Sequence, residues 1–221
     1  MKEFCKRLFL PPHCPYCNAV LGFEPECERC RTALPRLVCG PEPIACRKGL
    51  FLKEVHAVYD YEPPIQNAVW RLKFNDEPDL AEIFGGEMAC LFRKCELRAD
   101  ALVPVPSSRR KQKARGYSAP MLLAQQMGRE LGIPVLLVLE KVLETPDQHG
   151  LTRRERRVNL LGAFDVTDAQ AVRNKRILLV DDVFTTGSTL DECAKMLLAA
   201  GAEQCDALCF ARTKDKEPGK T

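Results

Sequence analysis

Hydrophobic residues follow two alternating patterns along the chain from residue 55 onward. Short apolar runs predict strands over residues 55–61, 101–106, 135–139, 177–181 and 205–212. Apolar positions at helical spacing predict helices over residues 65–74, 80 to about 95, 121–131 and 190–200, the last two stopped by Gly132 and Gly201. Strands and helices in this order predict an α/β fold, with a parallel sheet and right-handed crossovers.

The first 50 residues show neither pattern and are rich in Cys, Pro and Gly. Cys14-x2-Cys17 and Cys27-x2-Cys30, nine residues apart, form two knuckles that can present four thiolates tetrahedrally to one structural zinc ion. The alternative, a disulfide framework, is typical of secreted proteins. We therefore expect a small four-cysteine zinc-ribbon or knuckle module over residues 1–50, an α/β domain over 51–213 and a flexible tail over 214–221.

Charge and hydropathy restrict the location and the partners. The 33 basic and 30 acidic residues leave a net charge of +3, which gives no general signal of polyanion binding. The apolar stretch near the N-terminus is too short for a signal peptide, and no run reaches the length of a membrane span. We expect a cytoplasmic protein that does not insert into membranes.

The segment ILLVDDVFTTGSTL, residues 177–190, carries the clearest chemistry. A buried strand changes there into two acids and a loop of small hydroxyl residues, which is where parallel sheets bind ligands. Backbone N–H groups, hydroxyls and a following helix N-terminus can hold a phosphate without lysine, so the loop is not a Walker A motif. The carboxylates suit the vicinal hydroxyls of a ribose. The alternative is a plain helix capped by Ser or Thr, with both acids solvated. The residues concerned are Asp181, Asp182, Thr185, Thr186, Gly187, Ser188 and Thr189.

VDDVFTTGSTL is similar to the signature of type I phosphoribosyltransferases, and residues 14 to 212 together resemble the ComF family of competence-associated proteins and its GntX relatives. The likeness rests on CPYC and CERC, RLKF near Lys73, LVPVP at 102–106, RGYS at 115–118, TPDQHGLTRRERRVNLLGAF at 145–164 and the phosphate loop. It implies a type I phosphoribosyltransferase-like parallel sheet flanked by helices.

The resemblance also implies roles for these residues. Asp181 and Asp182 hold the ribose diol of phosphoribosyl pyrophosphate, and residues 185–189 cradle its 5-phosphate. Residues after the strand at 101–106 face the pyrophosphate and its magnesium, and residues 145–159 form a hood that closes over the site. The candidates for these contacts are Pro106, Ser107, Arg109, Arg115, Arg153, Arg154 and Arg157. No residue receives a general acid or base role.

The family often carries a second Cys-x2-Cys set, which appears halved here. Cys39 and Cys46 remain, while Arg36 and Gly49 stand where their partners belong. We therefore expect one zinc ion, with the role of Cys5, Cys39 and Cys46 left open.

Two main functions remain open. The first is a phosphoribosyltransferase linked to DNA uptake in natural competence, which moves phosphoribosyl from its pyrophosphate to an unidentified acceptor. The second is a ligand-sensing, scaffold or single-stranded-DNA-binding component of the DNA-import machinery, in which the basic stretch 109–115 and Tyr117 meet nucleic acid. A third, simpler possibility is a fold that persists without any ligand.

Overall fold

The computed structural model describes residues 12–22, 24–34, 38–44, 51–107, 116–143 and 162–214. Its centre is a sheet of four parallel strands, in the order β1-β6-β5-β2. These strands are β1 (Val55–Asp60), β2 (Ala101–Pro104), β5 (Arg176–Phe184) and β6 (Gln204–Arg212). The parallel sheet and its flanking helices confirm the predicted fold class.

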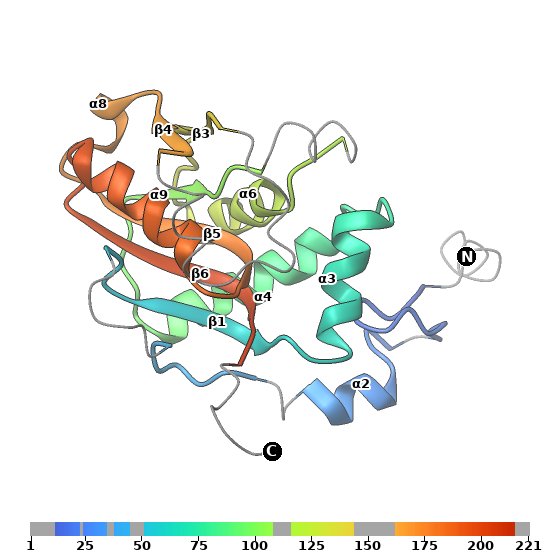
Figure 1. The fold of residues 1–221 in the computed structure, drawn as a ribbon. Helices are drawn as coiled ribbons and strands as arrows, with labels where there is room; N and C mark the ends of the chain where they lie inside the picture. The colour runs from blue at the N-terminus through green and yellow to red at the C-terminus, as the bar shows by residue number, and fades with distance from the viewer. Residues whose placement is uncertain are drawn as a thin grey trace, which may run out of the picture.

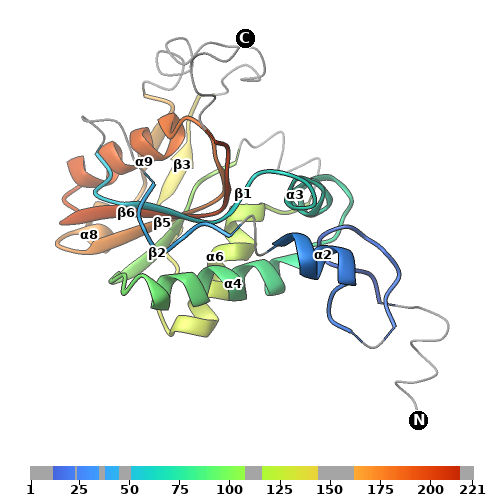
Figure 2. The ribbon, with the colours of Figure 1, turned by 90° about the horizontal axis from the view of Figure 1, so that it is seen from below.

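Helices cover both faces of this sheet, as Figure 2 shows. The helices α3 (Ile65–Phe74), α4 (Leu80–Lys94) and α6 (Ala119–Leu131) pack on one face, and α9 (Ser188–Ala199) packs on the other. Alternation along β5 sends Leu178 and Val180 to the first face, and Ile177 and Leu179 to the second. Because both faces are buried, β5 begins as an unbroken aliphatic run.

The predicted helices agree closely with the observed ones. The bounds of α3 are those predicted, and α6 ends at Gly132, whose φ of 69° is left-handed and suits glycine. The start of α6 lies two residues earlier than predicted, because Pro120 occupies its first turn, where the missing N–H costs no helical hydrogen bond.

The predicted strand over residues 135–139 is wrong. Val135 alone forms a parallel bridge with Leu102, through the bonds Leu102 N–H to Pro134 O and Leu136 N–H to Leu102 O. The next rung needs an N–H from Pro104, which has none, so the ladder stops there. The chain instead forms a small antiparallel hairpin of β3 (Leu139–Lys141) and β4 (Phe164–Val166), followed by the short helix α8 (Ala169–Val172).

The strand β5 is longer than predicted. It continues beyond Asp181 to Phe184, because Val183 and Phe184 still pair with β6. The two aspartates are therefore strand residues, and alternation directs their side chains to opposite faces of the sheet.

The described part of the N-terminal segment contains one short helix, α2 (Glu28–Ala33), and lies beside α3 and α4 (Figure 1). Cys14, Cys30 and Tyr16 belong to the same hydrophobic cluster as the α4 residue Phe84, on which the Tyr16 ring stacks with centroids 6.1 Å apart. The described part of this segment thus shares its core with the sheet domain.

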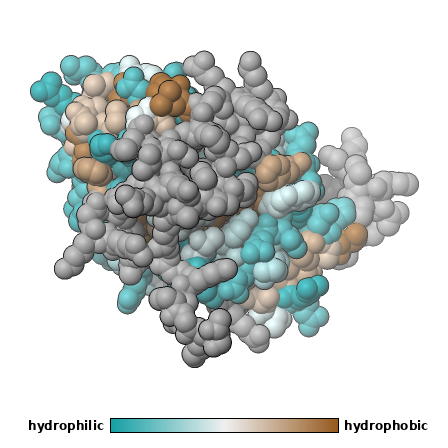
Figure 3. All heavy atoms as spheres, viewed as in Figure 1, coloured by the Kyte–Doolittle hydropathy of each residue, from teal (hydrophilic) through white to brown (hydrophobic). Residues whose placement is uncertain are grey.

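On the face drawn in Figure 3, hydrophobic side chains form separate patches among hydrophilic ones. Among the described residues, no helix is both long and apolar enough to cross a membrane.

Candidate functional site

The loop between β5 and α9 has the geometry of an anion cradle. Its Gly187 has φ of 75° and serves as the N-cap of α9, where no side chain caps the helix. A Cβ at this position would lie 3.0 Å from the Phe184 ring, so both the backbone and the space require glycine. The N-cap is therefore a glycine and not the Ser or Thr that the alternative interpretation predicted, and the positive end of the helix faces the loop.

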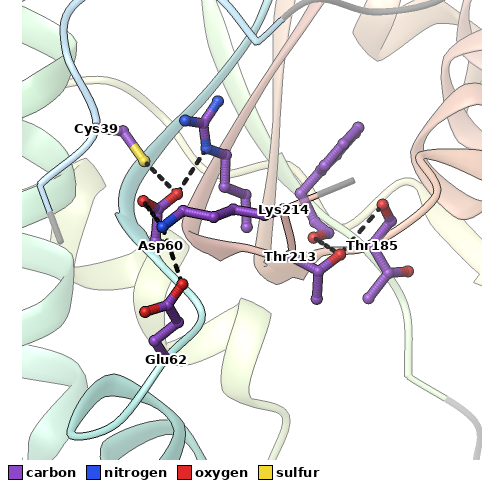
Figure 4. Close-up of polar contacts among 8 residues, drawn as sticks. Cys39, Asp60, Glu62, Thr185, Thr213 and Lys214 are labelled. Carbon is purple, nitrogen blue, oxygen red and sulfur yellow. Dashed lines mark hydrogen bonds and ion pairs between the residues drawn. The ribbon is translucent and has the colours of Figure 1, made fainter. Parts of the chain in front are cut away.

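Hydroxyl groups line this loop and fix it to the sheet. Thr186 Oγ1 and Ser188 Oγ lie 3.0 Å apart, and Thr186 Oγ1 also accepts from the Ser188 N–H at 3.4 Å. Thr213, just after β6, donates from its N–H to Phe184 O at 2.9 Å. Its hydroxyl contacts the carbonyl oxygen of Thr185 at 3.5 Å, as Figure 4 shows. The loop thus starts from a fixed point at the carboxyl end of the sheet.

Asp181 and Asp182 precede this loop and differ in their surroundings. The Asp182 Oδ1 atom lies 2.6 Å from Lys73 Nζ on α3. Burial raises the pKa of Asp181 to about 8, the charge of Asp182 adds to this effect, and Lys73 opposes it. Asp181 Oδ1 accepts the backbone N–H of Asp182 at 2.8 Å. The pair therefore holds less negative charge at neutral pH than two ordinary aspartates would.

Lys73 is the site residue to which sequence reasoning assigned no role. Its side chain is only 23% exposed. Burial disfavours its ammonium, yet the charge of Asp182 prevails and the pKa of Lys73 is raised. The residues 73 and 182 are far apart in the chain, and a lysine near a helix end carries no local signal of such a contact.

The end of β2 reaches the same edge of the sheet. Val105 donates its N–H to Val180 O at 2.9 Å, so Pro106 and Ser107 follow beside β5. The Ser107 hydroxyl lies 3.3 Å from that of Ser118 at the start of α6. The predicted contacts Arg109, Arg115, Arg153, Arg154 and Arg157 lie outside the described residues.

A second polar cluster occupies the ends of β1 and β6 (Figure 4). Asp60 accepts from Arg212 Nε at 3.0 Å, pairs with Lys214 Nζ at 3.1 Å and accepts from Cys39 Sγ at 3.7 Å. Burial raises the pKa of the Cys39 thiol to about 11. Cys39 therefore acts as a buried hydrogen-bond donor to Asp60. The other two cysteines whose role was left open, Cys5 and Cys46, lie outside the described residues.

The predicted zinc ligands Cys14, Cys17, Cys27 and Cys30 come together. Their four sulfur atoms all lie within 4.8 Å of one another, and a tetrahedral zinc–thiolate site places its sulfurs about 3.8 Å apart. Cys27 also caps α2, since its sulfur accepts the N–H of Cys30 at 3.4 Å. The cluster could hold a metal ion, and its four sulfurs suit zinc.

Comparison with known proteins agrees with this geometry. Residues 120–220 match the phosphoribosyl transferase domain family. Competence protein F of Haemophilus influenzae is 35% identical over 69% of this chain and 69% of its own length. DNA utilization protein YhgH of Salmonella typhimurium is 33% identical over 85% of this chain and 84% of its own. Competence protein ComFC of Bacillus subtilis is 26% identical over 85% of this chain and 72% of its own length.

Among solved structures, the glutamine phosphoribosylpyrophosphate amidotransferase of B. subtilis is similar with a TM-score of 0.45 and 19% identity. That match covers 63% of this chain and 30% of the larger enzyme.

Proposed function

The chain belongs to the ComF family, with a phosphoribosyltransferase-like domain, and from this premise we propose that it binds phosphoribosyl pyrophosphate with Mg²⁺ at the carboxyl end of β5. The observation that carries this proposal is the glycine N-cap of α9 at Gly187, in the loop that follows the Asp181–Asp182 pair and its Lys73 partner. An anion cradle beside groups that can bind a diol matches a ribose 5-phosphate.

Each part of the site has a proposed role. The first-turn N–H groups of α9, with the hydroxyls of residues 185–189, hold the 5-phosphate. Asp181 and Asp182, near the carboxyl end of β5, are proposed to meet the ribose hydroxyls. Lys73 reduces the negative charge that a polyanionic ligand meets there. Pro106 and Ser107 face the pyrophosphate, together with the arginines named above. Magnesium bound to the pyrophosphate would neutralise part of the charge of this leaving group.

The proposed reaction transfers phosphoribosyl to a nitrogen acceptor. The nitrogen lone pair forms a bond to C1 of the ribose while the C1–oxygen bond to pyrophosphate breaks, and the pyrophosphate leaves with the electron pair. The proton lost by the nitrogen passes to the pyrophosphate or to water. The chain contributes through position and electrostatics, since the transition state needs alignment and charge stabilisation. The hood that the family resemblance implies, residues 145–159, lies outside the described residues.

Binding is tested by calorimetry with phosphoribosyl pyrophosphate and Mg²⁺. The double variant Asp181→Asn with Asp182→Asn should lose binding, because each amide places an NH2 donor where a ribose hydroxyl needs an acceptor oxygen. Asp165→Asn on the exposed part of β4 is the matched control and should bind like the wild type. Wild-type affinity in the double variant refutes the site. Release of pyrophosphate, screened across bases, amines and nucleic acids, tests transfer.

The second candidate is a protein that binds the same ligand without transfer and serves as a sensor, scaffold or single-stranded-DNA-binding component of DNA import in competent cells. The relatives favour it, since they are named for competence and DNA utilization. Ligand binding without pyrophosphate release supports this candidate. Titration of single-stranded DNA with and without the ligand then shows whether the two compete for one site.

We propose that the chain is divided into an N-terminal module of residues 1–50, a domain of residues 51–213 and a tail of residues 214–221. In the N-terminal module, the four clustered cysteines hold one structural zinc ion. A site with four thiolates leaves no open position for catalysis. The ten described cysteines are free thiols, which suits a reducing cytoplasm. Metal analysis should find one zinc per chain, and two would refute this proposal.

A further inference from the structure

The helix α3 carries two cationic side chains that make contacts on different sides of the helix. Arg71 reaches the N-terminal cysteine module, and Lys73 reaches Asp182 on β5. Two residues correspond to about 200° of rotation around an α-helix, so the side chains leave it in nearly opposite directions. One rigid element therefore contacts both the proposed metal site and the proposed ligand site.

Arg71 holds the first cysteine knuckle by its backbone. Its Nη1 donates to Cys14 O at 2.8 Å and to Pro15 O at 3.0 Å. Nε donates to Glu77 Oε1 at 2.9 Å, and Nη2 pairs with the other carboxylate oxygen of Glu77. The Arg71 side chain is only 7% exposed. The planar Arg71 guanidinium thus donates both to the cysteine knuckle and to Glu77. Loss of the two carbonyl acceptors would leave buried N–H donors without partners.

Packing and hydrogen bonds fix α3 between its two contacts. Ile65, Val69 and Leu72 are fully buried against the core. The Tyr117 hydroxyl donates to Leu72 O at 2.7 Å, between the two cationic residues. Because a packed helix moves as a unit, displacement of the Arg71 end also displaces Lys73.

We infer that Arg71 is a positioning residue that couples metal occupancy of the Cys14–Cys30 cluster to ligand affinity at Asp182, through α3 and Lys73. The inference rests on the proposed function, since it takes zinc and phosphoribosyl pyrophosphate as the two ligands. With metal bound, the Cys14–Pro15 carbonyls are held in place and Arg71 anchors α3. Without metal the knuckle loses its order, Arg71 loses two acceptors, and Lys73 no longer keeps its short contact with Asp182.

Thermodynamic linkage makes this coupling reciprocal. If bound zinc increases affinity for the sugar phosphate, the bound sugar phosphate must increase affinity for zinc by the same factor. Coupling between sites of this kind is commonly about fivefold or more. The equilibrium affinity for zinc therefore reports the coupling without any measurement of catalysis.

The experiment measures the zinc affinity of the full chain by equilibrium competition with a chromogenic chelator, with and without saturating phosphoribosyl pyrophosphate and Mg²⁺. In the wild type we expect the ligand to increase zinc affinity about fivefold. Arg71→Met should bind zinc more weakly and show no effect of the ligand. Arg71→Lys, which can still reach one carbonyl, should recover part of the ligand effect. Arg93→Met is the matched control, because Arg93 is an exposed α4 arginine paired with Glu130, and it should behave as the wild type.

The outcomes separate the inference from the proposed function. If calorimetry shows ligand binding but the zinc affinity of the wild type does not change with ligand, the inference is refuted and the ligand site stands. If calorimetry shows no binding to the wild type, both fail. If Arg71→Met does not fold, Arg71→Lys decides: an undiminished ligand effect would show that the coupling does not pass through the Arg71 fork.

Discussion

Asp181 should make the fold less stable at alkaline pH. Burial raises its pKa to about 8, with a further contribution from Asp182, while an unfolded aspartate titrates near about 3.9. Between these values the folded state binds more protons than the unfolded state, so its stability falls as pH rises from about 4 to about 8. Replacing Asp181 by asparagine removes this penalty and should stabilise the protein above pH about 8.

The magnitude follows from the difference between the two pKa values. At 1.36 kcal/mol for each pKa unit, a rise to about 8 gives an upper limit of about 6 kcal/mol. Asp181 keeps some solvent access, and water around a partly exposed carboxylate reduces the penalty. We therefore expect Asp181→Asn to gain about 2 kcal/mol in the free energy of unfolding at pH about 8.5, and almost nothing at pH about 4.5.

Urea unfolding of the ligand-free protein at several pH values measures this difference. Asp165→Asn is the control, because Asp165 is exposed on β4 and its replacement should leave the free energy of unfolding close to that of the wild type. If the Asp181→Asn variant is no more stable than the wild type at pH about 8.5, the folded state does not oppose ionisation of Asp181. A variant that is more stable but no longer binds the sugar phosphate would show that the site sacrifices stability for ligand binding.

Three further changes test the site. Lys73→Met should weaken binding of phosphoribosyl pyrophosphate by about tenfold in calorimetry, because Asp182 loses its cation; unchanged affinity would contradict its role. Gly187→Ala should cost about 1–2 kcal/mol in thermal unfolding, since a left-handed backbone and the Phe184 ring both oppose a Cβ; Gly22→Ala, in open space with φ outside the left-handed range, is the control. Cys30→Ser should release the zinc and lower the melting temperature; an unchanged zinc content would exclude Cys30 as a ligand.

The sequence predicted the parts of the fold that depend on local pattern. The aliphatic run of β5 and the apolar run of β6 mark buried parallel strands because both of their faces are covered. The cluster of four cysteines was predicted from their spacing, since two Cys-x2-Cys knuckles are typical of a metal site.

The errors arose where a distant partner decides the structure. Residues 135–139 have the composition of a strand, but their neighbour β2 lacks the N–H at Pro104 that a second rung requires. The strand was predicted to end at Asp181, yet pairing of Val183 and Phe184 with β6 extends β5 beyond both aspartates. The contact of Lys73 with Asp182 depends on how α3 packs against the sheet, which no local pattern reports.

The proline in β2 also has a consequence between molecules. An exposed strand edge with regular donors and acceptors can recruit a strand from another copy of the protein, which starts aggregation. At the outer edge of β2, Leu102 already uses its N–H and its carbonyl oxygen with residues 134 and 136, and Pro104 offers no donor. The sheet therefore ends in an edge that cannot act as a template for a neighbouring chain.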